Sequence, residues 1–116
     1  MRTLVLVSAA MAFAFATVPA QTPPPPTPAQ IEAGKKVYTA QKCQTCHSVE
    51  GVGSKMSPLD GVGSKLTAAE IRAWITDPAP LIAKLKTKPK VAMKPYKLPP
   101  AELDALVAYL QSLTKK

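Results

Sequence analysis

The pentapeptide Cys43-Gln44-Thr45-Cys46-His47 holds both cysteines and the one histidine of this 116-residue sequence. The C-x-x-C-H order is the attachment pattern of a c-type haem. Two thiols three positions apart in a helical turn lie on one face, where each can add to one haem vinyl group. The next residue, His47, is then placed to be the proximal ligand of the iron.

Other chemistries of two cysteines and a histidine fit this sequence less well. A redox dithiol requires a thioredoxin-like βαβ context, which the flanking sequence does not provide. A structural zinc site requires four ligands, and this set is one short. An ordinary disulfide would leave the adjacent histidine unexplained. The pentapeptide therefore predicts one covalently bound haem c.

Residues 1–20 predict a signal peptide for export. Arg2 supplies a short positive region, and the stretch from Leu4 to Val18 is almost entirely apolar or small. Small residues before position 20 favour cleavage after Ala20. An uncleaved anchor is the alternative, although a comfortable membrane span needs about 20 apolar residues. The predicted location is the periplasm, with a membrane attachment only if this segment is retained.

Residues 21–28 contain five prolines in eight positions and predict a polyproline II linker. Residues 29–116 then form one small domain. Without Arg2, fourteen basic side chains face seven acidic ones, so the mature chain carries a net charge of +7. It keeps only four aromatic residues, which is a thin supply for a core. A buried porphyrin would provide the missing apolar body, and the haem-free chain is expected to be largely disordered.

Three segments have helical patterns, and no stretch alternates as a strand would, so the predicted fold class is all-α. The first helix is expected from Ala29 to Lys42, with Gly34 marking a close approach of another element. The second opens on the capping box Thr67-Ala-Ala-Glu70 and ends at Asp77, before a proline. The last begins at Pro100, carries an apolar stripe and is closed at its C-terminal end by Lys115 and Lys116.

The remaining segments predict loops. The sequence Gly-Val-Gly-Ser-Lys occurs at residues 51–55 and again at residues 61–65. Two such copies are too short for a repeat architecture, and they predict two glycine turns. Between Pro78 and Pro99 the chain is rich in proline and lysine, has no acidic residue, and contains Met93.

With these features in place, residues 29–113 resemble the class I c-type cytochromes of bacteria. The strongest carriers are the C-x-x-C-H motif, the stretch Met93-Lys-Pro-Tyr96 before the last helix, and Ala105-Leu-Val-Ala-Tyr109 within it. The resemblance implies terminal helices that cross near Gly34 and Tyr109. A middle helix and loops would wrap around the haem.

The resemblance also implies a set of site residues. Cys43 and Cys46 would hold the haem, and His47 and Met93 would be the axial iron ligands. Pro58 would lend its carbonyl to His47 and so fix the orientation of the ring. Trp74, on the middle helix, would lie near a haem propionate.

Two departures from the family pattern concern this ligand set. The family usually has Gly before the proline at position 58, and this chain has Ser57, preceded by Met56. Its methionine loop often reads Met-Pro, whereas a lysine separates Met93 from Pro95. Met56 is therefore a rival thioether ligand, and Lys94 and Lys90 are remote alternatives, but Met93 is preferred.

An iron held by histidine and methionine has no open position for a substrate, and methionine ligation raises the reduction potential. The expected function is therefore one-electron transport between respiratory or dehydrogenase partners, without enzymatic activity. A dedicated electron-transfer subunit of an oxidoreductase complex is an alternative. A gas-binding or sensor haem protein would need a displaceable Met93. A peroxidase is disfavoured by the single haem and the lack of a distal histidine.

Six lysines flank the predicted ligand loop with no interleaved acid. A positive field at this edge would steer an acidic redox partner and weaken with salt. Such runs are also common as ordinary solvated charge. Export disfavours nucleic acid as the partner. The predicted docking lysines are Lys84, Lys86, Lys88, Lys90, Lys94 and Lys97.

Overall fold

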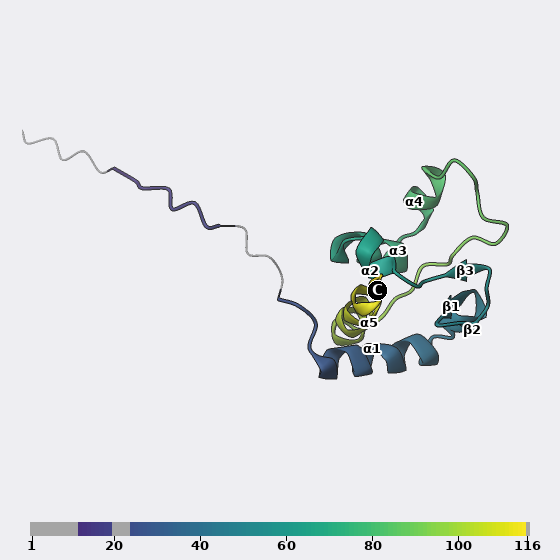
Figure 1. Cartoon of the computed structure of the whole chain (residues 1–116). Coiled ribbons are helices and arrows are strands. Elements are labelled where there is room, and N and C mark those ends of the chain that lie inside the picture. The colour runs from purple at the N-terminus through teal and green to yellow at the C-terminus, as the bar shows by residue number, and fades with distance from the viewer. Residues whose placement is uncertain (1–11, 20–23, 116) are drawn as a thin grey trace, which may run out of the picture.

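The computed structural model describes residues 12–19 and 24–115. This part of the chain is mostly helical and includes one small sheet (Figure 1). In chain order, the elements are α1 (Pro28–Ala40), the 3₁₀ turn η1 (Cys43–Thr45), β1 (His47–Val49), β2 (Val52–Gly53), β3 (Ser57–Pro58), α2 (Val62–Lys65), α3 (Ala68–Thr76), α4 (Ala79–Ala83) and α5 (Pro100–Ser112).

The first helix begins at a complete capping box. The Thr27 hydroxyl accepts a hydrogen bond from the Gln30 amide, and the Gln30 side chain accepts one from the Thr27 amide. Pro28 takes the first helical position, where its missing N–H costs nothing. The helix ends at Ala40, two residues before the predicted end, and Lys42 then adopts a left-handed conformation with φ 57°.

The predicted capping box at Thr67 and Glu70 is confirmed in α3. The Thr67 hydroxyl accepts from the Glu70 amide at 3.2 Å, and the Glu70 carboxylate accepts from the Thr67 amide at 2.7 Å. Asp77 caps the helix at its C-terminal end, directly before Pro78, as predicted. These local signals therefore fix both ends of the helix.

The two terminal helices, α1 and α5, pack against each other (Figure 1). Their approach is closest at Gly34, where an added Cβ would lie within van der Waals overlap of the Ala105 carbonyl oxygen and of Tyr109 Cβ. Tyr38 and Tyr109 meet edge to face, with ring centroids 5.5 Å apart. The close approach predicted for Gly34 is therefore confirmed.

A single hydrophobic core, the core cluster, is built around α5. The apolar side of α5 faces α1 and α3. Tyr38, on α1, is part of this core, and its burial raises its pKa to about 12. Most of the stripe predicted for this helix is buried, and its ends are half-buried. The buried members of the core cluster are Tyr38, Ile71, Ile75, Leu106, Val107, Tyr109 and Leu110.

A three-stranded sheet corrects the expectation of a wholly α-helical chain. Its strand order is β2-β1-β3, with β1 antiparallel to β2 and parallel to β3. Each strand has only two or three residues, which is too short to produce an alternating pattern in the sequence. Hydrogen bonding to neighbouring segments, not local propensity, therefore forms this sheet.

Two further segments differ from the predicted loops. The second Gly-Val-Gly-Ser-Lys copy turns only at Gly61 and then forms the helix α2. The proline-rich segment contains α4, directly after the buried Pro78, and the loop that follows extends away from the core before it returns to α5 (Figure 1).

The C-terminal lysines were expected to close α5, and Lys115 does not. It lies beyond the helix end, where its amide donates to the Ser64 hydroxyl at 2.9 Å and its side chain covers Gly61. The chain unwinds after Ser112, so Lys115 can reach α2. Lys116 is outside the described residues.

Residues 12–19 are exposed and have no regular structure, and they run away from the helical domain (Figure 1). The rest of the predicted signal segment, residues 1–11 and 20, lies outside the described residues, as do residues 21–23 of the predicted linker. Among the described residues, none of the helices has the length and apolar character to cross a membrane.

Candidate functional site

The two cysteines occupy a tight turn that follows α1. Cys43 opens the 3₁₀ turn η1, and the Cys46 amide donates to the Cys43 carbonyl at 3.2 Å. Both thiols are free and both residues are half-buried. Burial raises the pKa of the Cys43 thiol, which favours the protonated form. The helical turn expected around the motif is therefore present, in its tighter 3₁₀ form.

His47 begins strand β1, and its ring is oriented by a backbone carbonyl. Its Nδ1 lies 2.9 Å from the carbonyl oxygen of Ser57. A carbonyl can only accept, so Nδ1 carries the proton and donates it. The other ring nitrogen, Nε2, is then the one with a free lone pair.

This contact corrects the expectation that Pro58 supplies the carbonyl. In the parallel pairing of β1 with β3, His47 is opposite Ser57, and Pro58 is opposite Ser48. The register therefore brings the Ser57 carbonyl to the imidazole. Pro58 contributes indirectly, because the residue before a proline is confined to extended backbone.

The hairpin of β1 and β2 folds back onto the cysteine turn. The Ser54 amide donates to the Gln44 carbonyl at 2.9 Å. Gly53 has φ 105°, and an added Cβ there would overlap the His47 carbonyl oxygen and press on Gln44. The hairpin thus braces both residue 44, between the cysteines, and the histidine.

The late loop reaches the same part of the molecule. The Tyr96 amide donates to the Ile75 carbonyl at 2.8 Å, which ties the loop to the end of α3. Burial raises the pKa of Tyr96, and the charges of Cys43 and Cys46 raise it further. Tyr96, about fifty residues from the motif in sequence, is therefore within electrostatic reach of the cysteines.

The two candidate thioether ligands differ in burial. Met93 is half-buried, whereas Met56 is 65% exposed on the connection between β2 and β3. Trp74 is half-buried on α3, outside the core cluster. Half-buried apolar side chains that pack on the core cluster near the cysteine turn include Cys43 itself, Tyr96 and Leu98.

The six predicted docking lysines are all exposed. Two of them nevertheless have internal partners: Lys88 contacts backbone carbonyls of its own loop, and the Lys94 ammonium lies over the Tyr96 ring, 5.3 Å from its centroid. Ser57 and Gly53 were not among the predicted site residues, and Lys88 was predicted only as a docking lysine. The Ser-Pro sequence was the one available signal for Ser57, because it indicates extended backbone.

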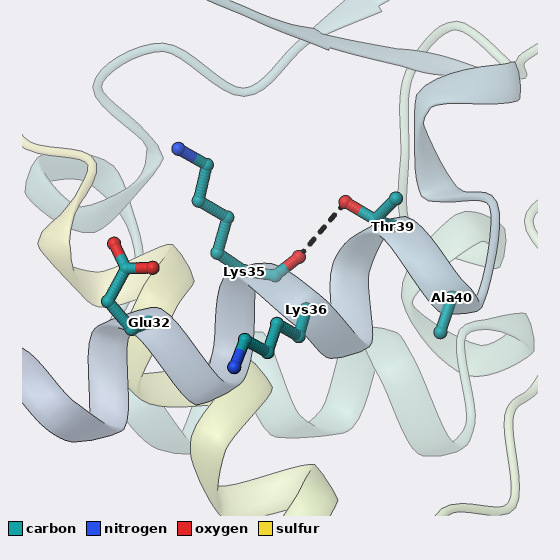
Figure 2. Close-up of a pocket in the computed structure, with 5 residues that line it drawn as sticks. All are labelled: Glu32, Lys35, Lys36, Thr39 and Ala40. Carbon is teal, nitrogen blue, oxygen red and sulfur yellow. Dashed lines mark hydrogen bonds between the residues drawn. The ribbon is translucent and has the colours of Figure 1, made fainter.

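A surface hollow of about 470 Å³ lies elsewhere, along the outer face of α1 (Figure 2). Glu32, Lys35, Lys36, Thr39 and Ala40 line it, and all five are exposed. Its one hydrogen bond joins the Thr39 hydroxyl to the Lys35 carbonyl within the helix. It contains none of the predicted site residues, so the cysteine turn remains the candidate site.

Comparisons with known proteins bear on the same region. A family model described as Cytochrome c matches residues 31–114, which is most of the chain and runs from within α1 through the turn and the sheet to the end of α5. Searches of curated proteins and of solved structures return no match.

Proposed function

The chain belongs to the cytochrome c family, and we propose that it is a periplasmic one-electron carrier with histidine and methionine as axial ligands. Members of this family bind haem c covalently, with iron, and transfer electrons. When bound, the haem supplies one-electron oxidation and reduction of its iron. The observation that carries the proposal is the His47–Ser57 hydrogen bond next to the two free thiols.

The residues around the turn fit such a group. Cys43 and Cys46 offer two free thiols on one turn, and a thioether bond to each would attach the porphyrin. Cys43, Tyr96 and Leu98 pack on the core cluster but are only half-buried, so an attached apolar group would cover the remaining surface. Burying apolar area stabilises a fold by about 25 cal/mol per Å².

His47 is the proposed proximal ligand. With Nδ1 donating to the Ser57 carbonyl, Nε2 is left to bind the iron, and the ring cannot turn without losing this hydrogen bond. A partner on the far nitrogen is how metal-bound histidines are usually oriented, and it makes the ligating nitrogen more basic. Ser57 therefore acts as a positioning residue in this proposal.

Met93 is the proposed distal ligand. Its partial burial and the anchor at Tyr96 support it over Met56, which is mostly exposed and immediately precedes the residue that contacts His47. A histidine–methionine pair leaves no coordination position open. That property favours electron transfer through the edge of the group over substrate or gas binding. Trp74 is proposed to lie near a propionate.

The location and the partners are part of the proposal. We assign residues 1–20 to a signal peptide, residues 21–28 to a linker, and residues 29–116 to the cytochrome domain. Exposed lysines around the late loop would attract an acidic redox partner, and steering by such fields raises association rates at low salt. Among the six, the lysines without an internal partner are Lys84, Lys86, Lys90 and Lys97.

The ligand assignment is tested by spectroscopy on the oxidised holoprotein. Met93→Ala should abolish the weak far-red charge-transfer band of a sulfur–iron bond, lower the reduction potential and allow carbon monoxide to bind the reduced form. Met56→Ala is the matched control and should leave all three unchanged. The reverse result would overturn the assignment. Covalent attachment is tested separately, by staining for haem on a denaturing gel.

A further inference from the structure

The side chain of Lys88 folds back onto its own loop. Its Nζ lies 3.1 Å from the carbonyl oxygen of Ile82, 2.6 Å from that of Ala83 and 2.7 Å from that of Leu85. An ammonium group has three N–H donors, so each donor has one carbonyl acceptor. This lysine is therefore engaged within the chain, although its surroundings are open to solvent.

The three carbonyls belong to the end of α4 and the residue pair that follows it. The last carbonyls of any helix have no partner within the helix, and they form its negative end. A helix of five residues is marginal by itself, since helix formation requires a costly first turn. The Lys88 ammonium supplies donors to the carbonyls of Ala83 and Leu85 and a compensating charge at this end, whereas the Ile82 carbonyl also accepts from the Leu85 amide.

The contact forms one end of the segment that carries Met93. At the other end, the Tyr96 amide donates to the Ile75 carbonyl at 2.8 Å. Among the described residues, no hydrogen bond joins residues 89–95 to the rest of the chain. Met93 thus lies in a short span of chain held at two points, Lys88 and Tyr96.

We propose that Lys88 is a positioning residue for Met93: its ammonium closes residues 82–88 into a clasp, and the clasp holds the span 89–95 in place. This inference rests on the proposed ligation by Met93. The proposal also separates Lys88 from the docking lysines, because the Lys88 ammonium binds carbonyls of its own loop. Without the clasp, the free span would begin near Lys84 and Met93 would leave its position more often.

Lys86 provides the matched control. It lies two residues from Lys88, is exposed, has the same charge and makes no hydrogen bond among the described residues. Neutralising either lysine removes one positive charge from the same loop. Only Lys88→Gln also replaces the three N–H donors of a bound ammonium with the two uncharged donors of a shorter side chain, so any difference between the two variants reports the clasp and not the charge.

The experiment uses the oxidised holoprotein and two measurements. The first is the rate at which imidazole replaces the sixth ligand, which follows the fraction of molecules with the loop open. The second is hydrogen exchange of the amides in residues 89–95. Lys88→Gln should increase both by about ten-fold, the size expected for losing one net hydrogen bond to a charged group at an exposed position. Lys86→Gln should change both by less than two-fold.

Lys88→Arg keeps the charge and several N–H donors. On a logarithmic scale, its two rates should therefore lie closer to those of the wild type than to those of Lys88→Gln. Equal rates in Lys88→Gln and Lys86→Gln, or equal rates in the Arg and Gln variants, would overturn the clasp. The ligand assignment fails separately, if Met93→Ala keeps its far-red band. Hydrogen exchange measures opening of residues 89–95 whichever ligand is bound, so the two failures are distinguishable.

Discussion

The pentapeptide Gly-Val-Gly-Ser-Lys occurs twice, ten residues apart, and the two copies have different structures. Residues 51–55 form a tight turn and the strand β2, whereas residues 61–65 form a left-handed residue and the helix α2. The first copy is almost entirely exposed, and the second begins with a buried glycine. Both copies begin with a left-handed glycine, Gly51 with φ 79° and Gly61 with φ 76°, and the segments around each copy decide the structure that follows.

The structure of each copy depends on the segment against which it packs. The first packs on the cysteine turn, where Ser54 bonds to the Gln44 carbonyl. The second packs on the end of α5, where the Gly63 amide donates to the Leu113 carbonyl at 2.8 Å. In both copies the glycine at the third position, Gly53 or Gly63, is pressed against the backbone of another segment. The copies differ because one contacts residues 44–47 and the other residues 111–115.

The largest expected effect is at Gly53. Replacing it with alanine would place a side chain at φ 105° and drive its Cβ into the His47 carbonyl. Strain at such a backbone and overpacking each cost about 1–3 kcal/mol, so the loss of stability should be about 4 kcal/mol. Denaturant unfolding of the holoprotein measures the loss, and a shifted reduction potential would report the disturbance at His47. An unchanged unfolding midpoint would show that β2 does not brace the site.

Gly63→Ala is the matched change in the second copy. Gly63 is already helical, so alanine brings no backbone strain, but its Cβ would overlap the Gln111 carbonyl. Overpacking alone predicts a loss of about 2–3 kcal/mol. The reduction potential should stay near the wild-type value, because this glycine contacts α5 and not the cysteine turn. A shift as large as that of Gly53→Ala would erase the distinction between the copies.

The valines of the two copies, Val52 and Val62, differ in burial, and smaller effects are expected from them. Val62 packs on the core cluster, whereas Val52 is 74% exposed. Val62→Ala should cost about 1 kcal/mol in the free energy of unfolding, as expected for deleting two half-buried methyl groups, and Val52→Ala should cost almost nothing. Thermal unfolding of both variants under one set of conditions checks this. Equal losses of unfolding free energy in the two variants would mean that Val52 is buried in solution.

The smallest expected effect concerns the serines. The Ser64 hydroxyl accepts from the Lys115 amide at 2.9 Å, and the Ser54 hydroxyl accepts from the Met56 amide at 3.3 Å. Ser64→Ala should cost about 0.5–1 kcal/mol and Ser54→Ala less, since the longer bond is weaker. The measurement is hydrogen exchange of the two amides that donate to these hydroxyls. The Lys115 amide should exchange faster in Ser64→Ala, and the Met56 amide should exchange faster in Ser54→Ala.

Local chemistry made several elements predictable from sequence. The capping box of Thr67 and Glu70, the proline that opens α5 and its apolar stripe are all signals contained within a few residues. The C-x-x-C-H turn and the close approach at Gly34 are of the same kind. In each case the residue type itself restricts the backbone or the contact.

The features that were missed depend on distant partners. The register of β1 with β3 selects the Ser57 carbonyl over that of Pro58 as the acceptor for His47, and a one-residue shift cannot be seen in a sequence pattern. The helix α4 has too few residues to show a period. The clasp of Lys88 depends on where three carbonyls lie, which a run of similar lysines does not reveal.

The contact between α1 and α5 can form only after both helices have been synthesised. The ribosome makes α1 early and α5 last, so Gly34 and Tyr38 have no surface to pack on until residues 105–109 have emerged. A nascent chain that ends before Pro100 lacks most of the core cluster. The core cluster therefore cannot close until the final helix has been made, and the segment 43–47 precedes that helix by more than fifty residues.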